Sequence, residues 1–237
     1  MKNIIQKKIE NIKERHDVCG ILLVGSFREK YRSGDFSEEE IKSDIDLFAV
    51  TEEKEFERSV DSFSGVEFDI SFITKEQLKK AAENETHSLI SMLSDCEVLE
   101  ADEETEKLLE EIRRVYEKGP EPIDKYFTDY KRFVFTSCLR TIKKRRDRIE
   151  FDILFNSLVA ELLKFHYLSS GKWIPPEKNL LKFIEDSNIL YILKEIYTDK
   201  EKSEKIRLIE ELFYAIMSDY GGKLDIWNEG RFPFDFK

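Results

Sequence analysis

Three strand-like runs between residues 20 and 73 constrain the fold of this chain more than any other feature. The runs span residues 20–26, 43–50 and 66–73, and each is an apolar or alternating segment rich in branched and aromatic side chains. Segments of this length, bounded by Gly, Ser or Asp, are typical of β-strands. We therefore expect the three runs to lie in one sheet.

Acidic side chains fall on one face of that predicted sheet. Successive side chains of a strand point to opposite faces, so Asp44 and Asp46 share a face and the apolar residues beside them take the other. If the strands pair with matched faces, Asp69 joins these two. Three neighbouring carboxylates repel one another and must take up protons or bind a cation, and hard oxygen ligands suit Mg²⁺ or Mn²⁺. The pattern predicts a metal site.

The first run ends in Gly25-Ser26 and continues into a polar, helix-capable segment. Such a strand end leaves backbone N–H groups and a hydroxyl available to a phosphate, and glycine allows the phosphate to approach the backbone closely. We therefore predict a phosphate site beside the metal site. Taken singly, each feature has a plainer interpretation: Gly-Ser as an ordinary turn, and Asp-x-Asp as solvated acids at a strand entry.

In this order, the residues resemble the DNA polymerase β-type nucleotidyltransferase superfamily. The resemblance comprises a strand ending in Gly25-Ser26, then Asp44-x-Asp46 flanked by apolar residues, then Asp69 on a later strand. The acidic chain and its helical second half are most similar to small-molecule nucleotidyltransferases of the kanamycin and lincosamide type. The segment of residues 27–43 is longer than its counterpart in the family, so the shape of the loop on the phosphate side is left open.

The resemblance implies a reaction and roles for these residues. The enzyme would transfer a nucleoside monophosphate, AMP from ATP or the equivalent from another nucleoside triphosphate, to a hydroxyl of a small acceptor. Asp44 and Asp46 would bridge two Mg²⁺ ions, and Asp69 would hold the ion that activates the attacking hydroxyl. The triphosphate-binding candidates are Gly25, Ser26, Lys42 and Ser43.

The sequence Gly119-Pro120-Glu121-Pro122 is the clearest boundary in the chain, because Gly and Pro both end helices. We predict an α+β protein with a nucleotidyltransferase catalytic domain, a mixed β-sheet with helices, at residues 1–118. An all-α helical bundle follows at residues 119–237, which the resemblance makes the acceptor-binding domain. The predicted bundle helices cover residues 123–148, 151–168, 177–185, 189–197 and 202–217.

The bundle holds weaker site candidates. Related enzymes that act on hydroxyl acceptors use a carboxylate of the helical domain as general base, so Glu161 and Asp152 qualify by type and location. A surface salt bridge is an equally good interpretation of both. Lys178 follows a Pro-Pro corner and resembles a lysine found after a proline turn in such domains, which makes it a further candidate for the nucleotide site.

Several local elements follow from shorter patterns. A helix is expected over residues 2–16, a short helix over 51–59, and a turn over 61–65. Thr74 is expected to cap the next helix, with Gln77 completing a capping box. Residues 96–99 are expected to form an edge strand.

The net charge of −11 limits the class of partner. Enzymes that hold nucleic acid depend on clustered Lys and Arg, so an acidic chain favours a small or cationic acceptor over a polyanion. No apolar run is long enough to span a bilayer, and the charged N-terminus differs from a signal peptide, so we expect a cytoplasmic protein with no membrane partner. A homo-oligomer is compatible with the sequence.

Two other functions fit the same motifs. The acceptor could be a protein side chain or an RNA end, as in a nucleotidyltransferase of the toxin–antitoxin type. The chain could also be a catalytically silent nucleotide-binding module that acts through a partner, because intact carboxylates do not prove turnover. The acceptor, the donor nucleotide and the general base are not determined by the sequence.

Overall fold

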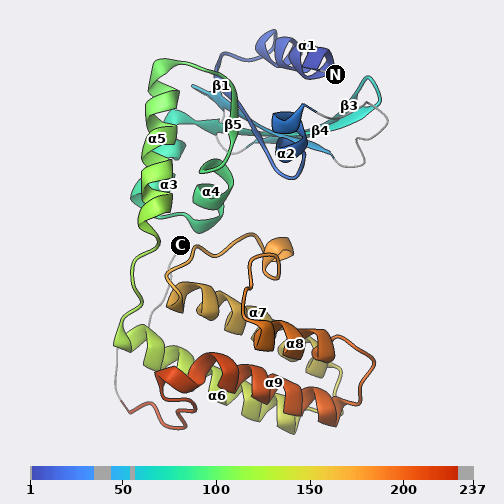
Figure 1. Ribbon diagram of the computed structural model, residues 1–237, viewed down its shortest axis with the longest axis vertical. Coiled ribbons are helices and arrows are strands. Elements are labelled where there is room, and N and C mark those ends of the chain that lie inside the picture. The colour runs from blue at the N-terminus through green and yellow to red at the C-terminus, as the bar shows by residue number, and fades with distance from the viewer. Residues whose placement is uncertain (1, 35–43, 54–56, 229–237) are drawn as a thin grey trace. The chain divides into compact units, whose positions relative to one another are not determined.

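The computed structural model describes residues 2–34, 44–53 and 57–228. The chain divides into two compact units, Met1–Pro120 and Glu121–Lys237. The first unit combines a β-sheet with helices and the second is helical (Figure 1). The predicted α+β fold class is confirmed.

The first unit contains a five-stranded mixed sheet in the order β3-β4-β2-β1-β5. The central pair, β2 and β4, is parallel, and the other neighbouring strands are antiparallel. The three predicted strands correspond to β1, β2 and β4, and the predicted edge strand to β5. The strands are β1 (Val18–Val24), β2 (Ile45–Thr51), β3 (Arg58–Phe63), β4 (Val66–Thr74) and β5 (Glu97–Ala101).

Helices cover both faces of this sheet (Figure 1). The amphipathic α1 (Lys2–Lys13) packs Ile5, Ile9 and Ile12 against one face. On the other face lie α3 (Lys75–Glu83), α4 (His87–Leu93) and α5 (Glu103–Lys118). Because alternate strand residues face opposite sides, each of β1, β2 and β4 contributes apolar residues to both cores. The short α2 (Phe27–Ser33) follows β1 directly.

The start of α3 has the predicted capping box. The Thr74 hydroxyl accepts a hydrogen bond from the Gln77 backbone N–H at 3.2 Å, and the Gln77 side chain accepts one from the Thr74 N–H at 3.0 Å. Both bonds satisfy donors that a helix start leaves without partners. This local pattern could be predicted because it depends only on residues three positions apart.

The described part of residues 51–59 is not helical (residues 54–56 lie outside the described residues), and the turn predicted over 61–65 is confined to Ser64 and Gly65. Arg58–Phe63 forms β3, which pairs antiparallel with β4. Ser64 and Gly65 connect the strands with φ values of 54° and 83°. A two-residue hairpin turn with positive φ at both positions matches the twist of the strands it joins, and this geometry extends the sheet by one strand.

The second unit is built from four α-helices and two short 3₁₀ turns within the described residues. Its core is rich in phenylalanine, including Phe135, Phe151, Phe165 and Phe213. The prediction of a helix over 177–185 is wrong, since only a 3₁₀ turn forms there. The elements are α6 (Lys125–Lys144), α7 (Glu150–Ser169), η2 (Glu177–Asn179), α8 (Ser187–Ile196), α9 (Lys202–Met217) and η3 (Ser218–Tyr220).

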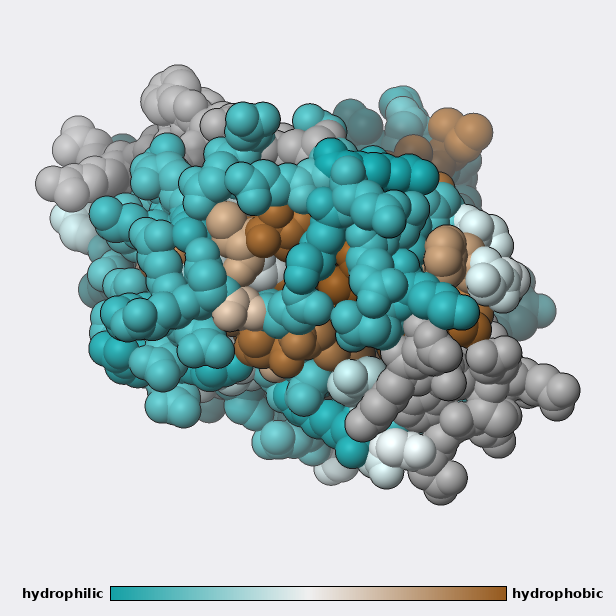
Figure 2. Space-filling view, turned by 90° about the horizontal axis from the view of Figure 1, so that it is seen from above, coloured by the Kyte–Doolittle hydropathy of each residue, from teal (hydrophilic) through white to brown (hydrophobic). Residues whose placement is uncertain are grey.

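Hydrophilic residues dominate the face of the molecule seen in Figure 2, where hydrophobic ones show mainly in a small central area. This agrees with a chain in which 38% of residues are charged. Of the helices that the structure describes, none is both long and apolar enough to cross a membrane.

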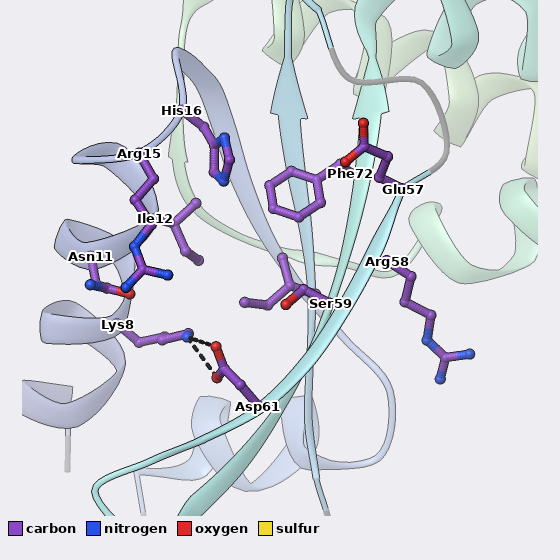
Figure 3. Close-up of a pocket in the computed structure, with 11 residues that line it drawn as sticks. Lys8, Asn11, Ile12, Arg15, His16, Glu57, Arg58, Ser59, Asp61 and Phe72 are labelled. Atoms are coloured by element: carbon purple, nitrogen blue, oxygen red, sulfur yellow. Dashed lines mark hydrogen bonds and ion pairs between the residues drawn. The ribbon is translucent and has the colours of Figure 1, made fainter.

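One lysine lies in the interface between α1 and the sheet. Lys8 is only 2% exposed, and its ammonium lies 2.7 Å from both carboxylate oxygens of Asp61 on β3 (Figure 3). The same ammonium lies over the rings of Phe63 and Phe68, at 5.5 and 5.7 Å from their centroids. Asp61 keeps 40% of its side chain exposed, so the lysine of the pair is shielded from water and the aspartate is partly solvated.

This asymmetry gives a stability prediction. Asp61→Asn should lower the free energy of unfolding by about 2 kcal/mol, because the buried ammonium loses its counter-charge. Lys8→Met should cost less, about 1 kcal/mol or below, because Asp61 can turn to water. Urea denaturation of both variants measures the difference, and equal losses would contradict the proposed asymmetry.

Candidate functional site

Strand pairing brings the three predicted aspartates together. In the parallel pair of β2 and β4, Asp46 lies directly opposite Asp69. Asp44 precedes β2 and lies two residues from Asp46, which puts it on the same side of the strand. One carboxylate oxygen from each of the three residues lies within 4.8 Å of the others. The predicted cluster of Asp44, Asp46 and Asp69 therefore forms.

An arginine neutralises part of this charge. Arg58, on β3, donates from Nε to Oδ1 of Asp69 at 2.7 Å, and its Nη2 contacts Oδ2 of the same carboxylate. Asp69 is only 8% exposed, so its charge has little access to water. The hydrogen bond to Asp69 is the main cause that raises the pKa of Arg58, and the negative charges of Asp69, Asp46 and Asp44 add to it.

Gly25 lies against the cluster. Its φ is +73°, and a Cβ at this position would lie 1.9 Å from Oδ2 of Asp46. Val24, the residue before it, is paired with Asp46 across β1 and β2. A side chain here would force the Asp46 carboxylate to move, so glycine suits both the packing of Asp46 and the close approach of a phosphate to the backbone.

Ser26 is exposed at the start of α2, and its hydroxyl makes no capping hydrogen bond to that helix. The Ser26 hydroxyl is therefore not used to cap α2 and is accessible to a ligand. Lys42 and Ser43, the other two phosphate-side candidates, lie outside the described residues, and their roles stay predictions.

The donor set fits a divalent cation. Mg²⁺ holds oxygen ligands at about 2.1 Å, so two ligands on opposite sides of one ion are about 4.2 Å apart. The carboxylate oxygens of the cluster lie within 4.8 Å, so a small rotation of the side chains brings them into that range. All three donors are hard oxygens, which Mg²⁺ and Mn²⁺ prefer.

Glu161, the candidate general base of the bundle, is held by two lysines. It accepts hydrogen bonds from Lys131 at 2.9 Å and from Lys164 at 3.2 Å. Burial alone would raise the pKa of Glu161, but the hydrogen bonds and charges of Lys131 and Lys164 together lower it. A carboxylate in this state is a weak proton acceptor, and the geometry is that of the salt-bridge interpretation. A role as base stays a prediction.

The other bundle candidates are exposed. Lys178 lies on the 3₁₀ turn η2, and Asp152 lies in the first turn of α7. The structure places neither in a cluster of described polar residues, so both roles also stay predictions.

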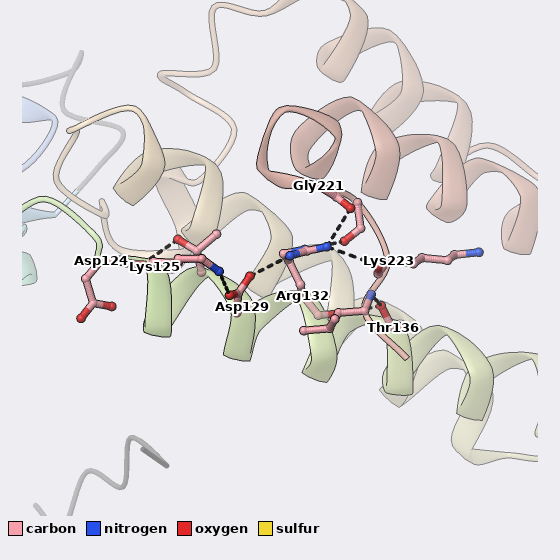
Figure 4. A network of polar contacts seen from close by, with 10 residues as sticks. Asp124, Lys125, Asp129, Arg132, Thr136, Gly221 and Lys223 are labelled. Carbon is pink, nitrogen blue, oxygen red and sulfur yellow. Dashed lines mark hydrogen bonds and ion pairs between the residues drawn. The ribbon is translucent and has the colours of Figure 1, made fainter. Parts of the chain in front are cut away.

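Sequence reasoning missed a polar network in the helical unit (Figure 4). Arg132 on α6 donates to the carbonyl oxygens of Gly221 at 2.8 Å and Gly222 at 2.9 Å, and also pairs with Asp129 at 2.7 Å. The Thr136 hydroxyl accepts from the N–H of the nearby Leu224 at 3.0 Å. The segment after α9 is thereby held along α6. In the sequence, Gly221-Gly222 indicates that the chain turns after α9, but it does not indicate that Arg132 binds this turn.

This segment helps to form a cavity of about 350 Å³ in the helical unit. Trp227 in its wall also contacts the rings of Tyr130 and Phe133, at centroid distances of 5.9 and 6.2 Å. Asp129 in the wall is paired with Lys125 and Arg132, so the cavity combines a neutralised polar side with an aromatic and apolar one. The lining residues are Lys125, Tyr126, Asp129, Leu224, Ile226, Trp227 and Asn228.

Sequence reasoning also missed Arg58 as part of the cluster. Its position depends on β3, a strand whose residues alternate between half-buried and exposed and that the sequence did not reveal. The Ser64-Gly65 turn was the available signal, because such a pair between two alternating segments predicts a hairpin.

The comparisons with known proteins bear on the fold. No protein-family model matches the chain, and no curated protein matches it either. Among solved structures it is similar to a nucleotidyltransferase-like protein from Exiguobacterium sibiricum 255-15, with a TM-score of 0.51 over 92% of this chain and 75% of that one, at 11% identity. The two proteins share a fold. The closer resemblance to kanamycin- and lincosamide-type enzymes stays a prediction.

The tight approach of Gly25 to Asp46 can be tested by one methyl group. Gly25→Ala should lower the free energy of unfolding by about 2 kcal/mol more than Gly65→Ala does. Both positions have positive φ and share the backbone strain, but a Cβ at Gly65 meets no atom within 4 Å. Urea denaturation of the two variants isolates the clash, and similar losses would show that the Asp46 side chain moves aside freely.

Proposed function

We propose that this protein is a metal-dependent nucleotidyltransferase that moves a nucleoside monophosphate, AMP from ATP, to a hydroxyl of a small-molecule acceptor and releases pyrophosphate. The observation behind the proposal is that Asp44, Asp46 and Asp69 meet next to the Gly25-Ser26 strand end. The fold shared with a nucleotidyltransferase-like protein supports it.

Each part of the cluster has a role in this proposal. Asp44, Asp46 and Asp69 would hold Mg²⁺, which when bound neutralises phosphate charge and lowers the pKa of the attacking hydroxyl. The exposed Ser26 hydroxyl and the backbone N–H groups at the start of α2 would donate to the β and γ phosphates. The pairing of β2 with β4 fixes the backbone positions of Asp46 and Asp69, so these two ligands are held in place before the ion binds.

The helical unit supports a small acceptor. Its cavity is of the size that small-molecule ligands occupy, and its wall includes Tyr126, Ile226 and Trp227. The chain's net charge of −11 favours a neutral or cationic molecule over a nucleic acid. Lys143, next to the basic run of residues 144–146, is paired with Glu210, which leaves less positive charge for a polyanion.

The first test measures nucleotide binding and turnover together. Mg²⁺ with the correct nucleoside triphosphate should raise the melting temperature, since ligand at 100 times its Kd stabilises a protein by about 2.7 kcal/mol. Asp44→Asn combined with Asp46→Asn should lose both this increase and pyrophosphate release. EDTA should abolish the same two signals in the unaltered protein.

Glu106→Gln combined with Glu110→Gln is the matched control, because it removes two negative charges from the exposed face of α5. This control should behave like the unaltered protein. Binding of Mg²⁺ and nucleotide without pyrophosphate release, across a screen of hydroxyl-bearing acceptors, would point to the silent nucleotide-binding module. Release only in the presence of a protein or an RNA would point to those acceptors.

A further inference from the structure

Asp69 of the acidic cluster is paired with Arg58, an arginine on the neighbouring strand β3. Both oxygens of Asp69 are engaged by one guanidinium, through Nε at 2.7 Å and through Nη2. Figure 3 shows the Arg58 side chain pointing away from Lys8, Asp61 and His16, which lie on the α1 side of the sheet. The guanidinium of Arg58 therefore lies on the acidic face of the sheet.

The two partners of this ion pair differ in their access to water. The side chain of Asp69 is 10% exposed, whereas that of Arg58 is 67% exposed. A buried carboxylate beside two others needs a counter-charge, because it cannot be stabilised by solvent. The exposed guanidinium can return to water at little cost, because it belongs to an edge strand of the sheet.

A divalent cation at Asp69 would compete with Arg58 for the same two carboxylate oxygens. The planar fork of arginine matches the two oxygens of a carboxylate and takes one hydrogen bond to each. A cation within about 2.1 Å of the same oxygens would lie close to the guanidinium, and like charges at that distance repel strongly.

We propose that Arg58 is the resident counter-ion of the Asp44–Asp46–Asp69 cluster and that a divalent cation binding through Asp69 displaces its guanidinium. The proposal rests on the proposed function for the presence of the cation. Arg58 then acts as a positioning residue: it holds Asp69 in place in the metal-free protein and sets the affinity at which the metal enters.

Metal affinity in the absence of nucleotide tests this directly. Mn²⁺ titrations followed by electron paramagnetic resonance, at low ionic strength, measure the Kd of the bare ion. Arg58→Gln should lower the Kd by about 5-fold, because the competing cation is gone. Arg58→Lys keeps the charge but loses the fork, so its Kd should fall by about 2-fold.

Arg207→Gln is the matched control. Arg207 also makes a two-point contact, through Nε at 3.1 Å and Nη2 at 2.6 Å to Glu204, and is 54% exposed, but it lies in the helical unit. Its loss removes the same charge and should leave the Mn²⁺ affinity unchanged. Far-UV circular dichroism shows whether each variant is folded. If Arg58→Gln is unfolded, the Kd of Arg58→Lys decides the test.

The outcomes separate the two proposals. If the unaltered protein binds Mn²⁺ and Asp46→Asn does not, the metal site stands, and an unchanged or raised Kd in the Arg58 variants would overturn the counter-ion role. If Mn²⁺ does not bind through Asp46 in any variant, the metal-dependent function is overturned and the counter-ion proposal with it.

Discussion

The parallel pairing of β2 with β4 is the constraint on which the candidate site depends. It sets Asp46 opposite Asp69 and, by the same alternation, turns Leu47 and Ile70 toward α1. The two apolar cores on either side of the sheet fix this register, since a shift of one residue would move every side chain to the other face. The hydrophobic effect thereby holds together carboxylates that repel one another.

A second group of acidic side chains in the same unit is also stabilised by a positive charge. Lys75, the first residue of α3, lies 2.7 Å from Asp102 and 2.8 Å from Glu104, and 3.3 Å from Glu52 near the end of β2. The hydrogen bond to Asp102 is the main cause that raises the pKa of Lys75. One ammonium thus links a strand end to two helices, as Arg58 links β3 to β4.

The parts of the fold that depend on neighbours in sequence could be predicted. Strand alternation predicted the shared face of Asp44 and Asp46, and the capping box predicted the start of α3. Arg58 could not be placed, because its partner is determined by the pairing of an unrecognised strand. Glu161 was recognised as a carboxylate on a central helix, and its partner Lys164 lies three residues further along the same helix. Its other partner, Lys131, could not be predicted, because that contact depends on how α6 packs against α7.

The order of the strands along the chain has a consequence for folding. The acidic cluster belongs to β2 and β4, which are close in sequence and joined through the β3 hairpin, whereas β1 must pair its Gly20 with the distant Ala101 of β5. Closing a longer loop costs more chain entropy, so nearby strands pair more readily. We therefore expect β2, β3 and β4, the strands of the site, to pair early in folding, before β5 adds to the free edge of β1.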